Sequence, residues 1–137
     1  MLISTRGRYA LRVMIDLAEQ NTDKYIPMKD IAARQEISLK YLEKILPVLV
    51  ANGVIEGVHG KGGGYKLTRK PEEYLVGDIL RLTEGEIGPI SCDDCNPQSC
   101  PRTEFCRTKP MWDKLKDMIN AYFDGVTIAD LMKNNEL

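Results

Sequence analysis

The sequence predicts a mostly α-helical protein with one small β-hairpin and a long helix near its C-terminus. Three observations lead to this fold class. Apolar residues recur at helical spacing over residues 7–20, two further helical segments follow over 29–50, and a glycine-rich stretch joins two short β-forming runs over 54–68. A chain of 137 residues is long enough to bury a hydrophobic core.

The first helix is predicted over residues 7–20, because Tyr9, Val13 and Leu17 fall on one helical face. Ser4 and Arg6 stand just before it. Hydroxyl and guanidinium groups are suited to DNA phosphates, so these two residues are candidates for backbone contacts.

A short helix over 29–35, a tight connection at 36–37 and a helix capped by Ser38 together form a helix-turn-helix outline. The capped helix is expected to bury Leu39, Leu42, Ile45, Leu46 and Leu49. In this outline the second helix enters the major groove with its N-terminal residues at the base edges. Besides Ser38, the outward residues here are Lys40, Tyr41, Glu43 and Lys44.

Pro47 removes one backbone hydrogen bond inside the second helix, which is expected to bend there without ending, before Asn52-Gly53 closes it. Residues 54–59 and 64–68 then predict a β-hairpin with a glycine-rich tip. A helix-turn-helix followed by a hairpin is a winged helix. His59 and Lys61 are placed for contacts of this wing with the DNA backbone or minor groove.

A further helix is expected over 76–83. Pro110 then opens a long helix at its first turn, where proline is tolerated. An apolar stripe on this helix is suited to a partner helix in a homodimer, with packing inside the chain as the alternative; it consists of Trp112, Leu115, Ile119 and Tyr122. Thr127 is expected to cap a last short helix.

All four cysteines lie close together, at Cys92, Cys95, Cys100 and Cys106. Thiolates suit both iron–sulfur clusters and zinc. A zinc ribbon usually has two C-x2-C knuckles, and only Cys92 and Cys95 have that spacing. An iron–sulfur cluster is therefore favoured, and zinc is the alternative.

Charge is distributed unevenly: residues 1–70 carry a formal +5 and residues 71–137 carry −6. This asymmetry fits a nucleic-acid-binding face in the first half. The chain shows no signal-peptide core and no run of about 18 apolar residues, so a cytoplasmic protein without a membrane span is expected. His59 is the only histidine, and no nucleophile pairs with it, which argues against an enzyme.

The segments STRGRYALRVMIDLA, ISLKYLEKIL and HGKGGGYKL, in this order, resemble the Rrf family of bacterial winged-helix transcription regulators, most of all its IscR-type iron–sulfur cluster regulators. The resemblance implies a DNA-binding protein, usually a repressor, that acts as a homodimer on a double-stranded operator of genes for cluster assembly or cysteine supply. It also implies a two-iron (2Fe–2S) cluster with one non-cysteine ligand and three cysteines, which match Cys92, Cys100 and Cys106.

The resemblance leaves the fourth ligand open. The histidine that relatives place after the last cysteine is Lys109 here, and the acidic first-helix ligand of other members is Arg8; neither ligates iron while protonated. Cys95 is the simplest replacement, and the alternative is a carboxylate: Glu43, Asp93, Asp94 or Glu104. A nitric-oxide or redox sensor with the same ligands and a zinc-stabilised DNA-binding module are the alternative functions.

These elements divide the chain into three parts: a winged-helix DNA-binding domain over 1–85, a cysteine-rich cluster-binding loop over 86–109, and a dimerisation helix with a C-terminal helix over 110–137. The loop is rich in Asp, Pro and Ser and has little to bury. Metal binding is therefore expected to order it beside the start of the long helix.

Overall fold

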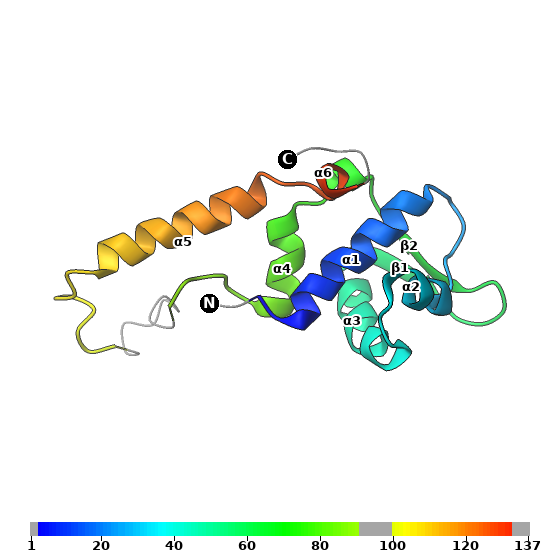
Figure 1. Ribbon diagram of the computed structural model, residues 1–137, viewed down its shortest axis with the longest axis horizontal. Coiled ribbons are helices and arrows are strands. Elements are labelled where there is room, and N and C mark those ends of the chain that lie inside the picture. The colour runs from blue at the N-terminus through cyan, green and yellow to red at the C-terminus, as the bar shows by residue number, and fades with distance from the viewer. Residues whose placement is uncertain (1–2, 91–99, 133–137) are drawn as a thin grey trace.

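The computed structural model describes residues 3–90 and 100–132 and confirms the predicted fold class, mostly helical with a two-stranded antiparallel hairpin (Figure 1). The elements in chain order are α1 (Thr5–Gln20), α2 (Met28–Gln35), α3 (Leu39–Ala51), β1 (Ile55–Val58), β2 (Gly64–Leu67), the 3₁₀-helix η1 (Pro71–Glu73), α4 (Val76–Glu84), α5 (Lys109–Asp124) and α6 (Ile128–Leu131).

The main hydrophobic core forms around α1, which contacts α2, α3, α4, α6 and β2. The buried face of α1 repeats at helical spacing, as the sequence predicted, and includes Ala10, Val13, Met14 and Leu17. The helix begins at Thr5, two residues earlier than predicted, because the Ser4 hydroxyl caps it by accepting a hydrogen bond from the Gly7 N–H at 3.2 Å.

A buried carboxylate joins α1 to α2. The Asp16 side chain is 2% exposed and accepts hydrogen bonds from Arg34 Nε at 2.9 Å and Nη2 at 2.8 Å, and from Gln35 Nε2 at 3.1 Å. The hydrogen bonds to Asp16 raise the pKa of the Arg34 guanidinium above its ordinary value. A carboxylate buried this deeply needs such partners, so the network fixes the position of α2 on α1.

α3 agrees with the predicted second helix at both ends. The Ser38 hydroxyl accepts from the Tyr41 N–H at 3.1 Å, and the helix continues through Pro47 to Ala51. Val54 N–H then donates to the Leu49 carbonyl and Gly53, with φ +72°, donates to that of Val50, which forms a Schellman cap.

One buried position in α3 was predicted wrongly. Leu42, Ile45, Leu46 and Leu49 are fully buried, but Leu39 is 47% exposed. Leu39 has the helical spacing of the buried face, yet it occupies the first turn, which extends past the edge of the core.

The wing pairs Ile55 with Leu67 and Val58 with Gly64. Ile26, from the segment before α2, adds a third strand-like pairing: its N–H donates to the Tyr65 carbonyl at 2.8 Å and its carbonyl accepts from the Tyr65 N–H at 2.9 Å. Gly64, with φ +151°, lies so close to the Ile26 backbone that a β-carbon would overlap it. The base of the wing is thereby fastened to the helix-turn-helix.

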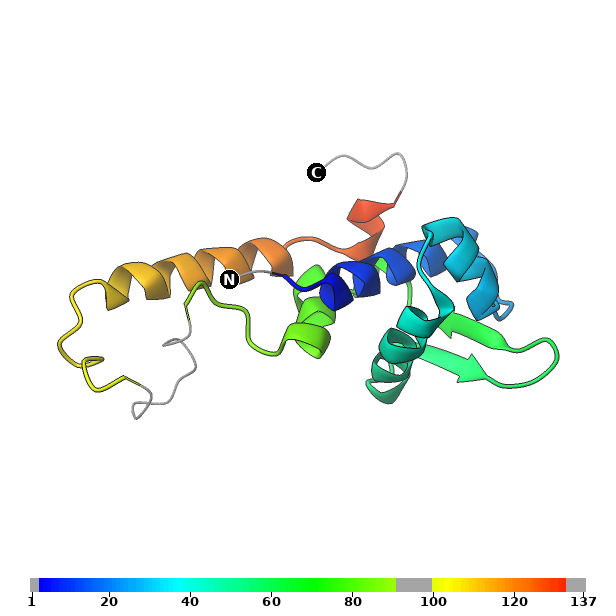
Figure 2. The same ribbon diagram turned by 60° about the horizontal axis from the view of Figure 1, so that its bottom comes forward.

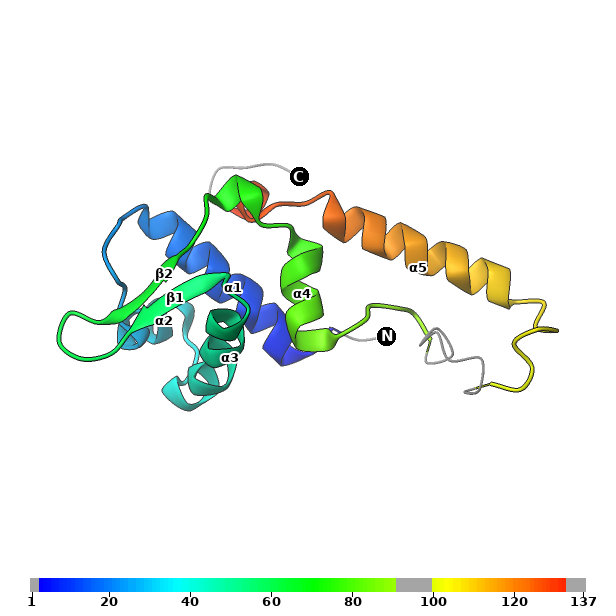
Figure 3. The same cartoon turned by 180° about the vertical axis from the view of Figure 1, so that it is seen from behind.

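α5 projects away from the winged-helix part (Figures 1 and 3). Near its C-terminal end, Ile119 and Phe123 pack against a second, smaller core that consists of Val76, Leu80, Ile87 and Val126. The chain then returns to the main core, where Ile128 is fully buried, and Thr127 caps α6 as predicted. The C-terminal helix therefore packs mainly on α1 and η1 of the winged-helix part.

Candidate DNA interface and cysteine segment

The first three turns of α3 present a mostly polar stripe to solvent, which we call the α3 stripe. Lys40, Glu43, Lys44 and Pro47 are all exposed and follow one another at spacings of three, one and three residues, which places them on one helical face. α3 and the wing lie at the same end of the molecule, away from the projecting α5 (Figure 2). Two lysines and a carboxylate on this face are suited to base edges and phosphates.

Tyr41 does not stand fully outward with these residues. Its ring is half-buried and meets the Tyr9 ring of α1 edge-on, with centroids 5.1 Å apart. The Arg12 guanidinium lies 5.0 Å from the centroid of the Tyr9 ring and bonds to Gln35 of α2. Tyr41 thus connects the start of α3 to the first turns of α1.

The wing tip carries the other predicted contacts. His59 and Lys61 are both exposed, and Gly60 and Gly62 beside them have φ values of +95° and +78°. Glycine adopts these left-handed conformations readily, so the tip of the wing turns sharply and the Lys61 ammonium group stays accessible. This geometry is compatible with a wing that approaches the DNA backbone.

At the N-terminus, the structure adds a contact that sequence reasoning missed. Arg6 and Ser4 are both exposed at the start of α1, but the polar groups of Ser4 already have a partner within the chain. The Ser4 N–H donates to Glu84 Oε1 at 3.0 Å, and the Ser4 hydroxyl bonds to the same oxygen. Glu84 is the last residue of α4 and lies 80 positions away in sequence. No local pattern connects two residues so far apart.

Two of the four cysteines, Cys92 and Cys95, lie outside the described residues, as do Asp93 and Asp94. Cys100 and Cys106 are half-buried free thiols. Cys106 Sγ lies 3.3 Å from Thr108 Oγ1, and this contact lowers the pKa of the Cys106 thiol, with help from the backbone N–H groups of Thr108 and Lys109 and from the charge of Arg102. A stabilised thiolate is the form that ligates iron or zinc, so the described part of the segment fits such a group.

Among residues 3–90 and 100–132, no three His, Cys, Asp or Glu side chains lie close enough together to hold a metal ion; two of the four cysteines fall outside these ranges. Lys109 Nζ donates to both carboxylate oxygens of Asp113, each at 2.7 Å. Arg8 Nη2 bonds to Thr5 Oγ1 at 3.0 Å within α1. Glu43 and Glu104, the two carboxylates among the predicted alternative ligands that the structure describes, are exposed.

The predicted stripe on α5 divides between two environments. Ile119 faces the smaller core and Trp112 is half-buried, whereas Leu115 and Tyr122 are exposed. Two residues that sequence reasoning omitted, Met111 and Met118, are also exposed, the latter by 60%. The exposed stripe, which we call the α5 stripe, consists of Met111, Leu115, Met118 and Tyr122, at spacings of four, three and four residues.

A polar cluster fastens α5 to α4. Arg81 donates to Asp124 Oδ1 and Oδ2, each at 2.9 Å, and to Asn120 Oδ1 at 2.8 Å. The hydrogen bonds to Asp124 raise the pKa of Arg81. Asn120 also donates to the Ile87 carbonyl at 2.9 Å, and Lys116 pairs with Glu86 at 3.3 Å. The chain that leaves α4 is therefore held along α5.

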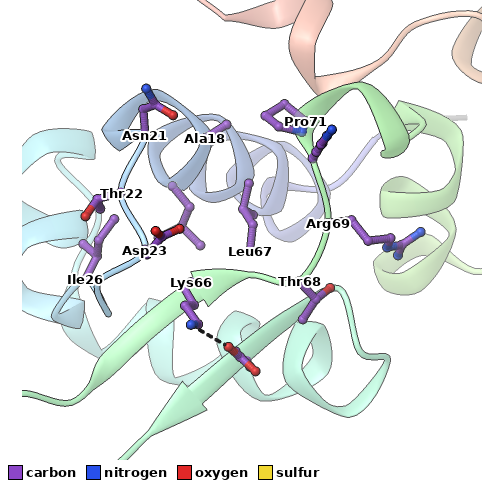
Figure 4. A pocket seen from close by; sticks show the side chains of 13 residues that line it. Ala18, Asn21, Thr22, Asp23, Ile26, Lys66, Leu67, Thr68, Arg69 and Pro71 are labelled. Atoms are coloured by element: carbon purple, nitrogen blue, oxygen red, sulfur yellow. Dashed lines mark ion pairs between the residues drawn. The ribbon is translucent and has the colours of Figure 1, made fainter.

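A cavity of about 590 Å³ lies between the end of α1 and the base of the wing (Figure 4). An ion pair of 3.2 Å between Lys66 and Glu56 lies in it. No histidine or cysteine is among its lining residues, and Thr68 already donates to the Gly53 carbonyl at 2.7 Å.

A helix-turn-helix with an exposed lysine-bearing second helix, followed by a glycine-tipped wing, defines a winged-helix DNA-binding protein. Residues 3–134 match the family model Rrf2, described as an iron-dependent transcriptional regulator. The chain therefore belongs to the Rrf2 family. It is a DNA-binding transcription regulator and not an enzyme.

The chain is 39% identical over all of its 137 residues to the protein rrf2 of Nitratidesulfovibrio vulgaris, of which it covers 91%. Among solved structures it is similar to T. potens IscR, with a TM-score of 0.77, 35% identity, and coverage of 99% of this chain and 89% of that one. It is equally similar in fold to CymR, the global cysteine regulator of B. subtilis, with a TM-score of 0.78, 31% identity, and coverage of 99% of both chains.

No helix in the ranges 3–90 and 100–132 is long and apolar enough to cross a membrane.

Proposed function

We propose that this chain is a transcriptional repressor that binds a double-stranded operator as a homodimer and responds to iron–sulfur cluster status through Cys92, Cys100 and Cys106. The position of Cys106 carries the proposal. Its thiol, whose ionised form is stabilised, lies three residues before α5, and the far end of α5 is bound to the winged-helix part by Arg81. A cluster bound next to the start of α5 would therefore act directly on the helix that connects the cysteine segment to the winged-helix part.

The DNA contacts that we propose come from three sites. Lys40 and Lys44 bind base edges or phosphates, and Glu43 favours sites that offer a cytosine amino group. Ser38 and Tyr41 contact the backbone beside them, and Ser4 and Arg6 do so at the start of α1. His59 and Lys61 approach the minor groove from the wing. The support is the exposure of the α3 stripe and of the wing tip.

The homodimer is proposed to form along α5. Four large apolar side chains, those of the α5 stripe, are exposed at the spacing of a coiled-coil seam. Of the other two predicted stripe residues, Ile119 packs against the smaller core beside α4, and Trp112 is half-buried near the start of α5. The α3 helices of the two protomers, which we call the reading helices, then bind two half-sites of the operator. This is how dimeric helix-turn-helix proteins bind DNA.

The cluster is proposed to be of the 2Fe–2S type, with Cys95 as the fourth ligand. An all-cysteine set needs no side chain from another element, and Lys109 and Arg8 are cations at the positions where relatives supply other ligands. When bound, the cluster supplies a group that oxidants, nitric oxide and iron supply can alter. The chain's own residues hold it, and Thr108 keeps the Cys106 thiol ready to ligate.

Cluster occupancy is proposed to act through the α4–α5 contact. Residues 86–109 run from the end of α4 to the start of α5, and Glu86 and Asn120 bind this connection to α5. A change in the cysteine segment alters the direction of α5 relative to α4. Because α5 carries the dimer contact, such a change alters the distance between the two reading helices.

Anaerobic purification with a visible spectrum and iron, sulfide and zinc analysis tests the proposal. We expect a coloured protein with iron and sulfide, and a different DNA affinity for the loaded and metal-free protein at matched salt. A colourless protein with one zinc per chain would instead establish the zinc-stabilised module. Equal affinity of a loaded and a metal-free preparation would refute the sensing step while leaving DNA binding intact.

A further inference from the structure

We infer that Glu84 occupies a phosphate position at the DNA-facing end of α1, so that DNA must displace its carboxylate from Ser4 to bind fully. This inference rests on the proposed DNA interface. It adds a residue that limits DNA affinity from within the chain.

The first observation is the chemistry of the contact. Glu84 Oε1 accepts from the Ser4 N–H at 3.0 Å and bonds to the Ser4 hydroxyl, directly before the first turn of a 16-residue helix. Backbone N–H groups, a serine hydroxyl and a helix N-terminus are the groups that proteins use to bind phosphate. The carboxylate of α4 therefore satisfies donors that are suited to the DNA backbone.

The second observation is the space made for this carboxylate. Gly7 is buried, and a β-carbon at this position would collide with Glu84 Oε1 and approach Thr83 Oγ1 to 3.1 Å. Gly7 has an ordinary helical conformation, so the absence of its side chain serves close approach and not an unusual backbone angle. A side chain at position 7 would therefore require the Glu84 carboxylate to shift, so Gly7 permits this contact.

The third observation is the orientation of this end of α1. Tyr9, one turn and a half beyond Ser4, contacts Tyr41 in the first turn of α3 at 5.1 Å between ring centroids. Arg6 and Arg8 are exposed on the same turns as Ser4. A duplex on the α3 stripe therefore passes close to this cationic end of α1, where Glu84 adds a negative charge that repels phosphate.

Glu84 also lies on the covalent path to the cysteine segment. It is the last residue of α4, Gly85 follows with φ +73°, and Glu86 pairs with Lys116 of α5. A shift of the chain at Glu86 therefore moves the Glu84 carboxylate, which lies only two residues earlier in the sequence.

The test compares Glu84→Gln with the wild-type protein by fluorescence anisotropy on a labelled duplex of non-specific sequence, over a series of salt concentrations. Glutamine keeps an oxygen that accepts from Ser4 but loses the charge, so the fold is retained and phosphate competes better. We expect affinity to rise roughly fivefold at low salt and the slope of log K against log salt to become more negative by about one.

Glu86→Gln is the matched control, because it removes the same charge two residues later from a side chain that pairs with Lys116. An equal rise in both variants, or no rise in Glu84→Gln, would overturn the inference. Lys44→Ala and Lys61→Ala distinguish an error in the role of Glu84 from an error in the proposed DNA interface. If they weaken binding while Glu84→Gln changes nothing, only the role of Glu84 is lost; if they change nothing either, the proposed DNA interface is itself wrong.

Discussion

Arg81 of α4 holds Asp124 of α5 in a two-pronged contact, with both N···O distances at 2.9 Å. A planar guanidinium that meets both oxygens of a carboxylate fixes direction as well as distance. Asn120 accepts a third hydrogen bond from the same guanidinium at 2.8 Å. This contact helps to set the orientation of the projecting helix, together with Ile119 and Phe123, which pack against the smaller core.

Asp124→Asn removes the charge that this contact requires, and Asp78→Asn provides a matched control on the same arginine. Asp78 is 67% exposed in its ion pair with Arg81 and lies 3.4 Å from it. We expect Asp124→Asn to lower the free energy of unfolding by about 0.5–1 kcal/mol and Asp78→Asn to change it by less than about 0.5 kcal/mol, since both pairs are partly solvated. Urea unfolding measures both; equal losses would contradict the assigned role of Asp124.

The helical elements could be predicted because their causes are local. Ser38 caps α3, Gly53 ends it, and the buried leucines of α3 recur at three- and four-residue spacing. Leu39 shows the limit of this reasoning, since periodicity gives the side of a helix but not where the core ends along its axis.

The missed contacts join residues that are distant in sequence. Ile26 pairs with Tyr65, Ser4 with Glu84, and Arg81 with Asp124. Each depends on how the completed core places the elements, so no pattern within one segment predicts it. The α5 stripe was predicted only in part for the same reason: Ile119 turns toward α4 and Met118 away from it once α5 is docked.

Asp16→Asn tests the buried link between α1 and α2. Asparagine retains the shape but cannot pair with the charge of Arg34, although Arg34 is 39% exposed and remains partly hydrated. We therefore expect a loss of roughly 2–3 kcal/mol in the free energy of unfolding. Glu56→Gln, which breaks the more exposed pair with Lys66, is the control and should cost less than about 1 kcal/mol. A loss for Asp16→Asn no larger than the control would show that the network is not needed.

Glu43→Gln tests whether the carboxylate on the α3 stripe contributes to sequence preference. Removal of its charge relieves repulsion of phosphate at every site. It also replaces a charged acceptor by a neutral amide, which accepts more weakly from a cytosine amino group and can itself donate to purine acceptors, so its preference among bases is reduced. Binding to a non-specific duplex should strengthen. The affinity for the selected sequence, divided by the affinity for a random sequence, should fall by roughly 5- to 100-fold. Glu72→Gln, at an exposed position in η1, should leave this ratio unchanged. Selection from a random duplex library with each variant, followed by sequencing, provides the measurement.

Met118→Lys tests the dimer proposed along the α5 stripe. A lysine at the centre of a paired apolar seam loses the packing of the methionine and faces its own symmetry copy. We expect the variant to be monomeric at micromolar concentration by light scattering, with an unchanged helical signal by circular dichroism. Asp117→Lys introduces a lysine at the next exposed position, outside the stripe, and should remain dimeric. Monomeric wild-type protein would refute the proposed dimer, and a dimeric Met118→Lys variant would place the interface elsewhere.

Thr108→Val tests the electrostatic environment of Cys106 in metal-free protein. The Thr108 hydroxyl, 3.3 Å from Sγ, donates to the ionised thiol and is the largest cause of its lowered pKa. A lowered pKa keeps the thiolate populated as the pH falls, and this reactivity is lost only when the pH passes below the lowered value. Valine removes the hydroxyl, so the pH midpoint of Cys106 alkylation, followed by peptide mass spectrometry, should move upward.

Thr103→Val is the control. It removes the hydroxyl that donates to the Cys100 carbonyl at 2.8 Å and should leave the pH midpoint of Cys106 alkylation in place, because that hydroxyl is bonded to a carbonyl and not to the Cys106 sulfur. An equal shift in both variants would mean that loop order, and not the hydroxyl of Thr108, stabilises the thiolate.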